Sequence, residues 1–241
     1  MRRTLRLVRF AAVLLAAWVV PPASAAVTDG QFGGEIAVPA SAGPSTATVS
    51  ADFMRAMQHF HRGESAAALN LWRQLADNGD REAQFTLGAL HTTGDRQAGI
   101  DRDLPAAADW YRRAAELGHG MAQFNLGVLY ANGSGVPQDM TAAARWWQRA
   151  AIQGHVEAQF NLGLLYAQGM GIAADPVEAA RWWDLAAKQG SAAAQFNLGV
   201  MYVKGEGVDL DPIEAVRLWQ LSARQGFGQA IHILKTLDLA E

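Results

Sequence analysis

Apolar residues recur along this chain at the three- and four-residue spacing of amphipathic helices. Between residues 120 and 154 they form two stripes, separated by a short Gly-rich stretch. The first stripe contains Ala122, Leu126, Leu129 and Tyr130. The second contains Ala143, Trp146, Trp147, Ala150 and Ala151, in which small residues alternate with large ones. This pattern predicts two helices that pack closely as an antiparallel pair.

The same pair of stripes occurs four times. Each first stripe carries an Ala-Gln-Phe phrase that ends in Leu-Gly, and the copies begin at Ala83, Ala122, Ala158 and Ala194. The first step is 39 residues and the next two are 36. Self-similarity at such a period indicates stacked units, because a single hairpin cannot bury its apolar face alone. The phrase also places a glycine inside the helix, which costs about 1 kcal/mol relative to Ala. We therefore expect a second helix to approach it closely.

Start and stop signals bound the second helix of each unit. The segment Asp175-Pro176-Val177-Glu178 combines an N-cap Asp, a Pro at the first helical position and a Glu at the third. Asp211 begins the same pattern, and Asp103 and Asp139 hold the equivalent position in the other units. The helices are predicted to end before a C′ glycine, at Gly118, Gly154, Gly190 and Gly226.

These signals predict an all-α chain, an α/α superhelical solenoid of helical hairpins. We expect a capping hairpin at 51–79, repeats at 81–118, 120–154, 156–190 and 192–226, and a C-terminal cap helix at 227–240. The end units are imperfect copies, as caps usually are.

The order Ala-x-x-x-Leu-Gly-x-Leu-Tyr, then Gly-x-Gly-Val, then Ala-x-x-Trp-x-x-x-Ala-Ala-x-x-Gly, resembles the Sel1-like repeat, a relative of the tetratricopeptide repeat with a longer turn. The resemblance covers residues 81–226. The first unit departs from it, because His91-Thr92-Thr93-Gly94 replaces the Tyr end and the loop from Asp95 to Asp101 is longer. The resemblance implies a non-enzymatic adaptor in protein complexes, often at the bacterial envelope.

The N-terminus has the features of an export signal. Four basic residues, Arg2, Arg3, Arg6 and Arg9, precede an apolar run at 10–20 and an Ala-Ser-Ala site. Eleven apolar residues are too few to span a bilayer, which needs about 20. We expect a signal peptide at 1–25 that is cleaved after Ala25, a flexible linker at 26–50, no stable membrane insertion, and a periplasmic or secreted product.

Charge and composition narrow the chemistry. The chain has 20 Lys and Arg against 23 Asp and Glu, and loss of the four leader Arg leaves 16 against 23, a net charge of −7. Such a chain lacks the basic footprint of a nucleic-acid binder. It has no Cys, no nucleophile motif and no His-Glu-x-x-His. His119 and His155, equivalent residues, are interpreted as polar residues of the turns between repeats. We expect no catalytic, metal or cofactor site.

The alternative hypothesis is a cell-wall enzyme or regulator that acts on peptidoglycan or another glycan, including a penicillin-binding or β-lactamase-like role. Paired aromatic residues such as Trp182-Trp183 could stack on sugars. Adjacent residues point about 100° apart on a helix, so one of each pair is expected in the core. We interpret Tyr111, Trp147, Trp183 and Trp219 as core residues and their neighbours as more exposed.

A second stripe on the first helices predicts a binding surface. A helix that is apolar on two faces is either sandwiched or presents one face to a ligand. In tetratricopeptide relatives the matching residues line a concave groove, and an Asn amide suits an extended peptide backbone. The resemblance therefore predicts a groove for a protein or peptide partner, lined by Phe85, Phe124, Asn125, Val128, Phe160, Asn161, Leu164, Phe196, Asn197 and Val200. The sequence leaves open the other reading, in which these Phe pack between helices and these Asn bond locally.

Overall fold

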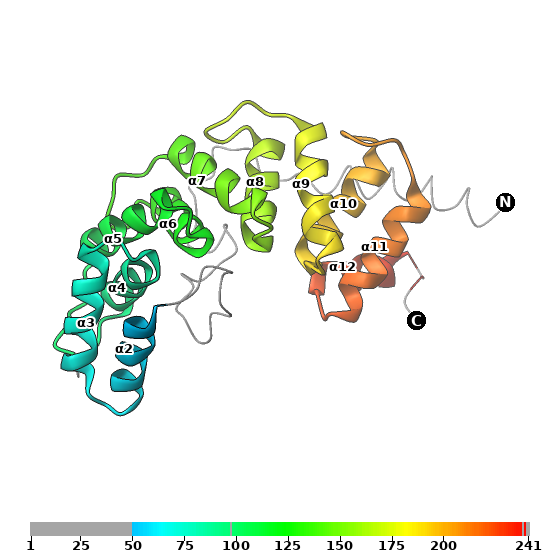
Figure 1. Cartoon of the computed structure of the whole chain (residues 1–241). Coiled ribbons are helices and arrows are strands. Elements are labelled where there is room, and N and C mark those ends of the chain that lie inside the picture. The colour runs from blue at the N-terminus through cyan, green and yellow to red at the C-terminus, as the bar shows by residue number, and fades with distance from the viewer. Residues whose placement is uncertain (1–49, 97, 238, 240–241) are drawn as a thin grey trace. The chain divides into compact units, whose positions relative to one another are not determined.

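The computed structural model describes residues 50–96, 98–237 and 239, so the predicted leader and almost all of the predicted linker lie outside it. The described residues form eleven α-helices and no strand, apart from an isolated bridge between Asp95 and Ile100 (Figure 1). The all-α repeat fold predicted from the sequence is confirmed.

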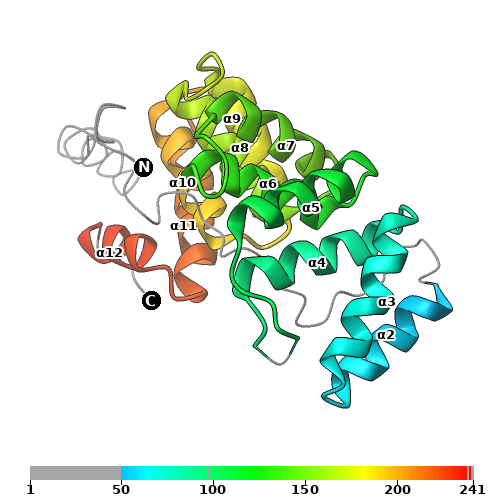
Figure 2. The ribbon, with the colours of Figure 1, turned by 90° about the vertical axis from the view of Figure 1, so that its left-hand side faces the viewer.

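The described residues fall into two compact units, an N-terminal unit at 50–155 and a C-terminal unit at 156–239. The N-terminal unit contains α2 (Ala51–His61), α3 (Ser65–Asp77), α4 (Arg81–Thr93), α5 (Leu104–Glu116), α6 (Gly120–Asn132) and α7 (Met140–Ile152) (Figure 2). The C-terminal unit contains α8 (Val156–Gln168), α9 (Pro176–Lys188), α10 (Ala192–Lys204), α11 (Pro212–Arg224) and α12 (Gly228–Thr236). The even-numbered helices from α4 to α10 are the first helices of the repeats, and the odd-numbered ones from α5 to α11 are the second.

Side-chain caps fix where the helices begin. The second helices α5, α7, α9 and α11 have the N-cap carboxylates that the sequence indicates, and each carboxylate accepts a backbone N–H of the first turn. These caps are Asp103, Asp139, Asp175 and Asp211. The caps of the first helices α4, α6 and α10 are of three different residue types. Asp80 caps α4, His119 caps α6 through an Nδ1 that accepts the Ala122 N–H at 3.1 Å, and Ser191 caps α10. His119 is thus a turn residue, as the sequence predicts.

An aromatic ring lies against the helical glycine of every repeat. Trp147 of α7 donates its indole N–H to the Phe124 carbonyl at 3.2 Å. A Cβ atom on Gly127 would come within 2.5 Å of that ring. Trp183 and Trp219 repeat the bond, to Phe160 and Phe196, at 3.1 Å. The close approach expected from the glycine is therefore present, and the ring needs the space that a side chain would fill.

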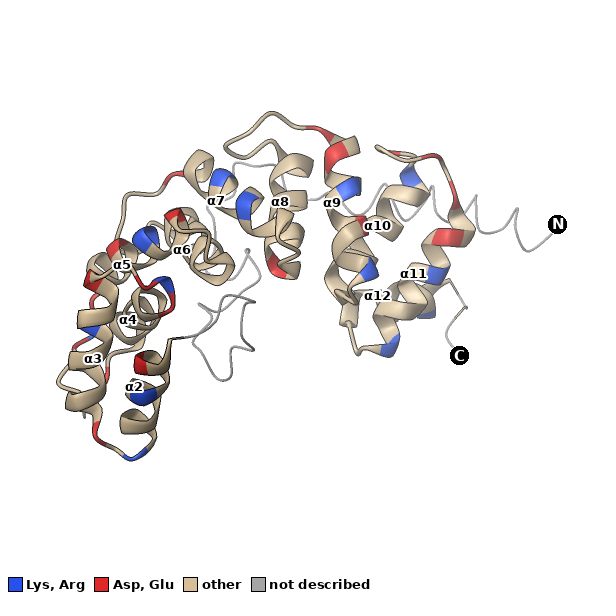
Figure 3. Cartoon of the chain, in the orientation of Figure 1, with Lys and Arg blue, Asp and Glu red and all other residues tan. Residues whose placement is uncertain are grey.

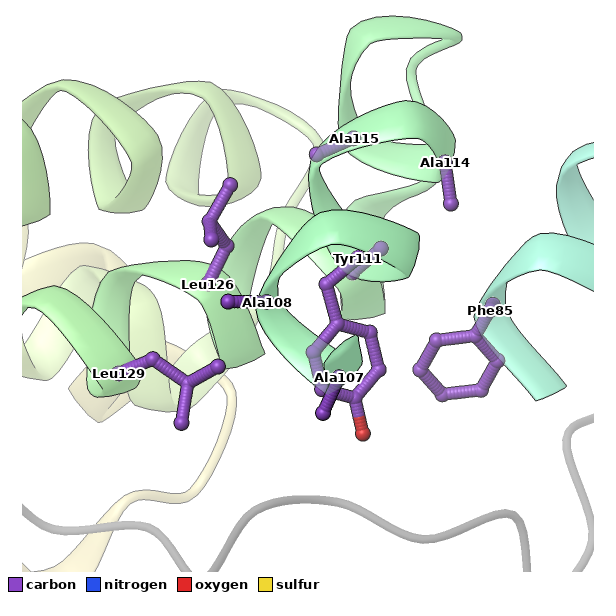
Figure 4. Packing of buried hydrophobic residues seen from close by; sticks show 9 residues of the cluster. Phe85, Ala107, Ala108, Tyr111, Ala114, Ala115, Leu126 and Leu129 are labelled. Carbon is purple, nitrogen blue, oxygen red and sulfur yellow. The ribbon is translucent and has the colours of Figure 1, made fainter. Parts of the chain in front are cut away.

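Tyr111 takes the place of the tryptophan in the first repeat. A Cβ on Gly88 would lie 2.6 Å from its ring. Figure 4 shows the Tyr111 ring beside Phe85, and their ring centroids are 5.8 Å apart. Tyr111 and the equivalent Trp147, Trp183 and Trp219 are at most 6% exposed, which agrees with the core role expected of them.

The second glycine of the turn between first and second helices joins neighbouring repeats. Gly207 has a φ of 70° and touches the start of α9, where a Cβ would lie 2.1 Å from the Pro176 carbonyl oxygen. Gly135, at a φ of 74°, lies against the start of α5 in the same way, and a Cβ there would come within 2.3 Å of the Leu104 carbonyl carbon. Only glycine combines this backbone conformation with this contact. The Gly-x-Gly-Val turn is therefore a packing device between repeats.

Candidate functional site

The predicted groove residues lie on the first helices, but most of them are covered. Phe85, Phe124, Val128 and Phe196 are at most 5% exposed, and Asn125 and Asn161 have no exposed surface at all. Phe160, Leu164, Asn197 and Val200 are partly exposed. The amides therefore do not form a continuous accessible row, which differs from the expectation. Whether a partner binds at any of the ten residues remains a prediction.

In the N-terminal unit the Phe side chains stack on the histidines that precede the next first helix. Phe85 lies 4.3 Å from His119 and Phe124 lies 4.4 Å from His155, centroid to centroid, with nearly parallel rings. His119 also binds Glu82 of α4, with 3.1 Å between Nε2 and the carboxylate oxygen. Because this hydrogen bond stabilises the carboxylate, it lowers the pKa of Glu82. Phe85 thus joins α4 to the cap of α6, and Phe124 packs on His155, which is the packing role that the sequence left open.

Asn125 serves the core of the N-terminal unit. Its side chain hydrogen-bonds the Tyr111 hydroxyl, which also lies 3.1 Å from the Thr92 hydroxyl. Burial raises the pKa of Tyr111 to about 12. Because Asn125 is also fully buried, its amide is not accessible to a peptide backbone. The local-bonding interpretation therefore describes Asn125 in this structure.

The four partly exposed residues all belong to the C-terminal unit, and we call them the accessible row: Phe160 and Leu164 on α8, Asn197 and Val200 on α10. Phe160 and Leu164 pack against a buried cluster from α9 and α10. Trp183 fixes the backbone of Phe160 through its indole N–H. Residues three or four apart share a helix face, so each helix contributes two neighbouring side chains to the row.

Sequence reasoning missed the role of the Gln in the repeated phrase. Gln123 is 3% exposed, donates to the Ala115 carbonyl at 3.0 Å, and accepts from Gln153 at 2.7 Å. Gln195 makes the same two bonds, to the Ala187 carbonyl and from Gln225, at 3.2 and 2.9 Å. Gln123 and Gln195 each join their first helix to the ends of two second helices. A polar residue that recurs in phase beside core positions is the signal that could have found it.

The exposed aromatic faces are not open platforms. Arg113 lies 4.6 Å above the Trp110 ring, and Arg149 lies 4.7 Å above the Trp146 ring. Both rings are partly exposed, whereas the equivalent Trp182 is only 4% exposed and lies under Arg181. A sugar would have to displace these guanidinium groups, whose cation–π contacts are favourable. The arrangement therefore gives no support to glycan stacking here.

No group of three or more His, Cys, Asp or Glu residues is placed to hold a metal ion within the part of the chain that the structure describes. In that same part, no helix is both long and apolar enough to cross a membrane.

Comparisons with known proteins agree with the repeat architecture. A scan against protein-family models matches the Sel1 repeat four times, at residues 81–119, 120–155, 156–191 and 192–227. A search of curated proteins found no match. Among solved structures, a Sel1 repeat protein from Oxalobacter formigenes is 30% identical with a TM-score of 0.68, and the alignment covers 77% of this chain and 73% of that one.

A second solved structure is a protective antigen present in uropathogenic Escherichia coli strains, which displays an SLR fold. It is 38% identical with a TM-score of 0.64, over 69% of this chain. The alignment covers 35% of that protein, so this chain spans about a third of its length. Four consecutive family matches, over more than half of the residues, coincide with the hairpins whose caps and Trp-on-Gly contacts are described above. The chain belongs to the Sel1 repeat family, whose members are generally non-catalytic scaffolds for protein interactions.

Proposed function

We propose that this chain is an exported Sel1 repeat scaffold that binds a protein or peptide partner along the accessible row of its C-terminal unit. The observation that carries the proposal is the difference in exposure between equivalent residues. Phe160 and Leu164 are partly exposed, whereas their counterparts Phe124 and Val128 are at most 3% exposed. The Phe position is thus packed at Phe124 and Phe196 but accessible at Phe160, and the Val128 position is accessible at both Leu164 and Val200.

The chemistry of the accessible row suits a polypeptide. Phe160, Leu164 and Val200 offer apolar surface, whose burial is the main favourable term in association. Asn197 adds an amide that donates to a carbonyl and accepts from an N–H. An extended peptide presents both groups along its backbone. Apolar contacts beside one amide therefore favour a peptide segment over a small polar ligand.

Site-specific crosslinking tests this surface. We would introduce a photoreactive benzoylphenylalanine at Val200 and, as a matched control, at Leu185 of α9, which is also apolar and is 36% exposed. The expected result is a crosslinked partner from envelope extract at position 200 and none at 185. Equal labelling at both positions would contradict the proposal, and so would absence of labelling at 200 while the unmodified chain retains its partner.

A substitution measures the contribution of the amide. Asn197→Ala removes up to two hydrogen bonds to a peptide backbone, each with a net value of about 0.5–1.5 kcal/mol. We expect partner binding to weaken by roughly tenfold with unchanged helicity. Full affinity in a folded Asn197→Ala variant would place the partner elsewhere.

Export rests on the leader described above, with its basic start, short apolar run and Ala-x-Ala site. N-terminal sequencing of the chain from its native host tests it. The expected first residue is Ala26. A retained Met1 on protein in the cytoplasmic fraction would reject the periplasmic or secreted location.

A further inference from the structure

We propose that the C-terminal unit carries a second docking surface, separate from the accessible row, for a polypeptide segment in which Lys or Arg residues flank aliphatic or aromatic ones. Its centre is an edge patch, defined by Val177, Leu210 and Ile213. These side chains are 61%, 60% and 69% exposed. The inference does not depend on the function proposed above, because it uses different residues and a different edge of the unit.

The fold brings the edge patch together. Val177 and Ile213 occupy the same position in consecutive repeats, the second residue of α9 and of α11. The turn that precedes α11 lies on the start of α9, because Gly207 contacts Pro176 and the Val177 amide. Leu210 belongs to this turn, and its Cβ faces Gly205. The three side chains therefore lie along one edge, where the turns meet the starts of the second helices.

The apolar character of this edge is not a requirement of the repeat. In the N-terminal unit the positions that match Val177 and Ile213 hold Pro105 and Thr141, and Gln138 stands where Leu210 does. The helix starts are formed there without Val, Leu or Ile at these three positions. Single exposed apolar residues are ordinary, but a contiguous group of them marks an interaction site more often. Since packing does not need these side chains, a partner is the better explanation.

Charge identifies the kind of partner. Segments 170–180 and 203–215, which form this edge, contain six acidic residues and one Lys. Figure 3 shows acidic residues gathered at the starts of α9 and α11 and in the turn before α11. Of these six acidic residues, Asp175 and Asp211 cap the two helices. Glu178 forms an ion pair with Arg181, and Glu214 forms one with Arg217.

Glu206 and Asp209 remain at the rim of the patch. The Glu206 side chain is 58% exposed and lies 3.6 Å from Lys204, while Asp209 is exposed beside Leu210. An acidic rim around an apolar centre favours a segment of opposite charge and suppresses acidic partners. This is why we assign a basic, apolar segment to the edge patch.

The test uses the full chain and two short fluorescein-labelled peptides, one of Leu and Lys and the other of Leu and Glu, followed by fluorescence anisotropy. The double variant Val177→Asn with Ile213→Asn removes most of the apolar centre. It should weaken binding of the Leu/Lys peptide about tenfold or more, because two side chains no longer bury apolar surface. The matched control is Ile152→Asn in the N-terminal unit, where Ile152 is 71% exposed. We expect it to bind like the unmodified chain.

Two further measurements separate the edge patch from general charge attraction. Glu206→Gln with Asp209→Asn should weaken Leu/Lys binding severalfold and reduce its salt dependence. Hydrogen exchange should show protection by the peptide at 172–178 and 205–214. Equal effects of the Ile152 control and the double variant, protection elsewhere, or equal binding of the Leu/Glu peptide would each overturn the proposal. Self-association of the chain that the double variant abolishes would also overturn it, since the occupant would then be a second copy.

Folding and the first proposal are controlled independently. The substituted residues are exposed, and the caps Asp175 and Asp211 are retained, so helicity and the thermal midpoint should not change. Crosslinking at Val200 should be unaffected by the edge variants. If the edge variants lose peptide binding but keep crosslinking at Val200, only the edge patch is affected. Each proposal can therefore fail while the other holds.

Discussion

Leu117→Gln is expected to stabilise the protein, although it replaces an aliphatic residue by a polar one. Gln84 of α4 donates to the Ala76 carbonyl at 3.0 Å, but its buried carbonyl oxygen has no hydrogen-bond partner. In the three later repeats the equivalent Gln oxygen accepts a hydrogen bond from a second Gln, which lies at the end of the following second helix. The three distances are 2.7, 2.8 and 2.9 Å. The first repeat has Leu117 at that position, and Leu117 is 49% exposed. The substitution therefore restores a donor where one is missing.

The backbone is already arranged for this bond. Leu117 has φ and ψ of −80° and 8°, and Gln153, which makes the bond in the second repeat, has −78° and 1°. A net hydrogen bond contributes about 0.5–1.5 kcal/mol, and satisfying a buried oxygen places it toward the upper part of that range. Ordering the Gln side chain costs part of this gain. We expect a net stabilisation of about 0.5–1 kcal/mol, which for a chain of this length corresponds to roughly 1–4 °C in the thermal midpoint.

Urea denaturation followed by circular dichroism measures the change, with Leu117→Ala as the control that removes the apolar side chain without adding a donor. The reciprocal variant Gln153→Leu leaves the buried Gln123 oxygen without its donor and should destabilise by about 1–3 kcal/mol. If Leu117→Gln is no more stable than Leu117→Ala, the interhelical Gln bond contributes nothing, and the reasoning fails. A neutral Gln153→Leu would lead to the same conclusion.

Three further outcomes follow from the packing and the charges. Gly127→Ala places a Cβ 2.5 Å from the Trp147 ring, so overpacking of about 1–3 kcal/mol should outweigh the helix propensity gained, and a lower urea midpoint checks it. Trp147→Ala should cost roughly 3–5 kcal/mol, clearly more than Trp146→Ala in the same assay, because Trp147 is fully buried and Trp146 is not. The pKa of Glu82 is lower in the folded state, so its stabilising effect is present above the unfolded pKa and is lost as the pH falls through the folded one. Glu82→Gln should therefore lose less stability than the unmodified chain when the pH is lowered. Urea midpoints between neutral pH and pH about 3 measure this loss. If the two proteins lose the same stability, the bond to His119 does not stabilise the fold.

The fold could be predicted from the sequence because each local signal agrees with the others. Asp175 and Asp211 are N-caps, the glycine of the repeated phrase lies under an aromatic ring, and the apolar stripes have helical periodicity. Such agreement between local and long-range requirements is what makes a sequence specify one structure. The period of the repeat then fixes which elements are neighbours.

Exposure of the candidate site could not be predicted in the same way. The helical period shows which residues share a face, but it does not show which neighbouring side chains cover that face. Asn125 is covered because the preceding second helix supplies Tyr111, whose hydroxyl needs a partner. Trp182, expected to be more exposed than Trp183, is only 4% exposed against 6% for Trp183. In both cases the outcome depends on tertiary neighbours that no single stripe contains.

Residues that recur from repeat to repeat and residues that differ between repeats have different roles in this protein. The recurring Gln, Phe, Gly and Trp side chains bond or pack one helix to the next, and those of the N-terminal unit are at most 5% exposed. If such residues bound a partner, the contacts between neighbouring repeats would be lost. Positions that differ between repeats have no such packing role. Leu117 leaves the Gln84 oxygen without a hydrogen-bond partner, and Leu210 and Ile213 are exposed at positions where the second repeat has Gln138 and Thr141. Because repeat proteins distinguish their partners while sharing one fold, the search for binding residues in this chain is best directed to positions where one repeat differs from the others.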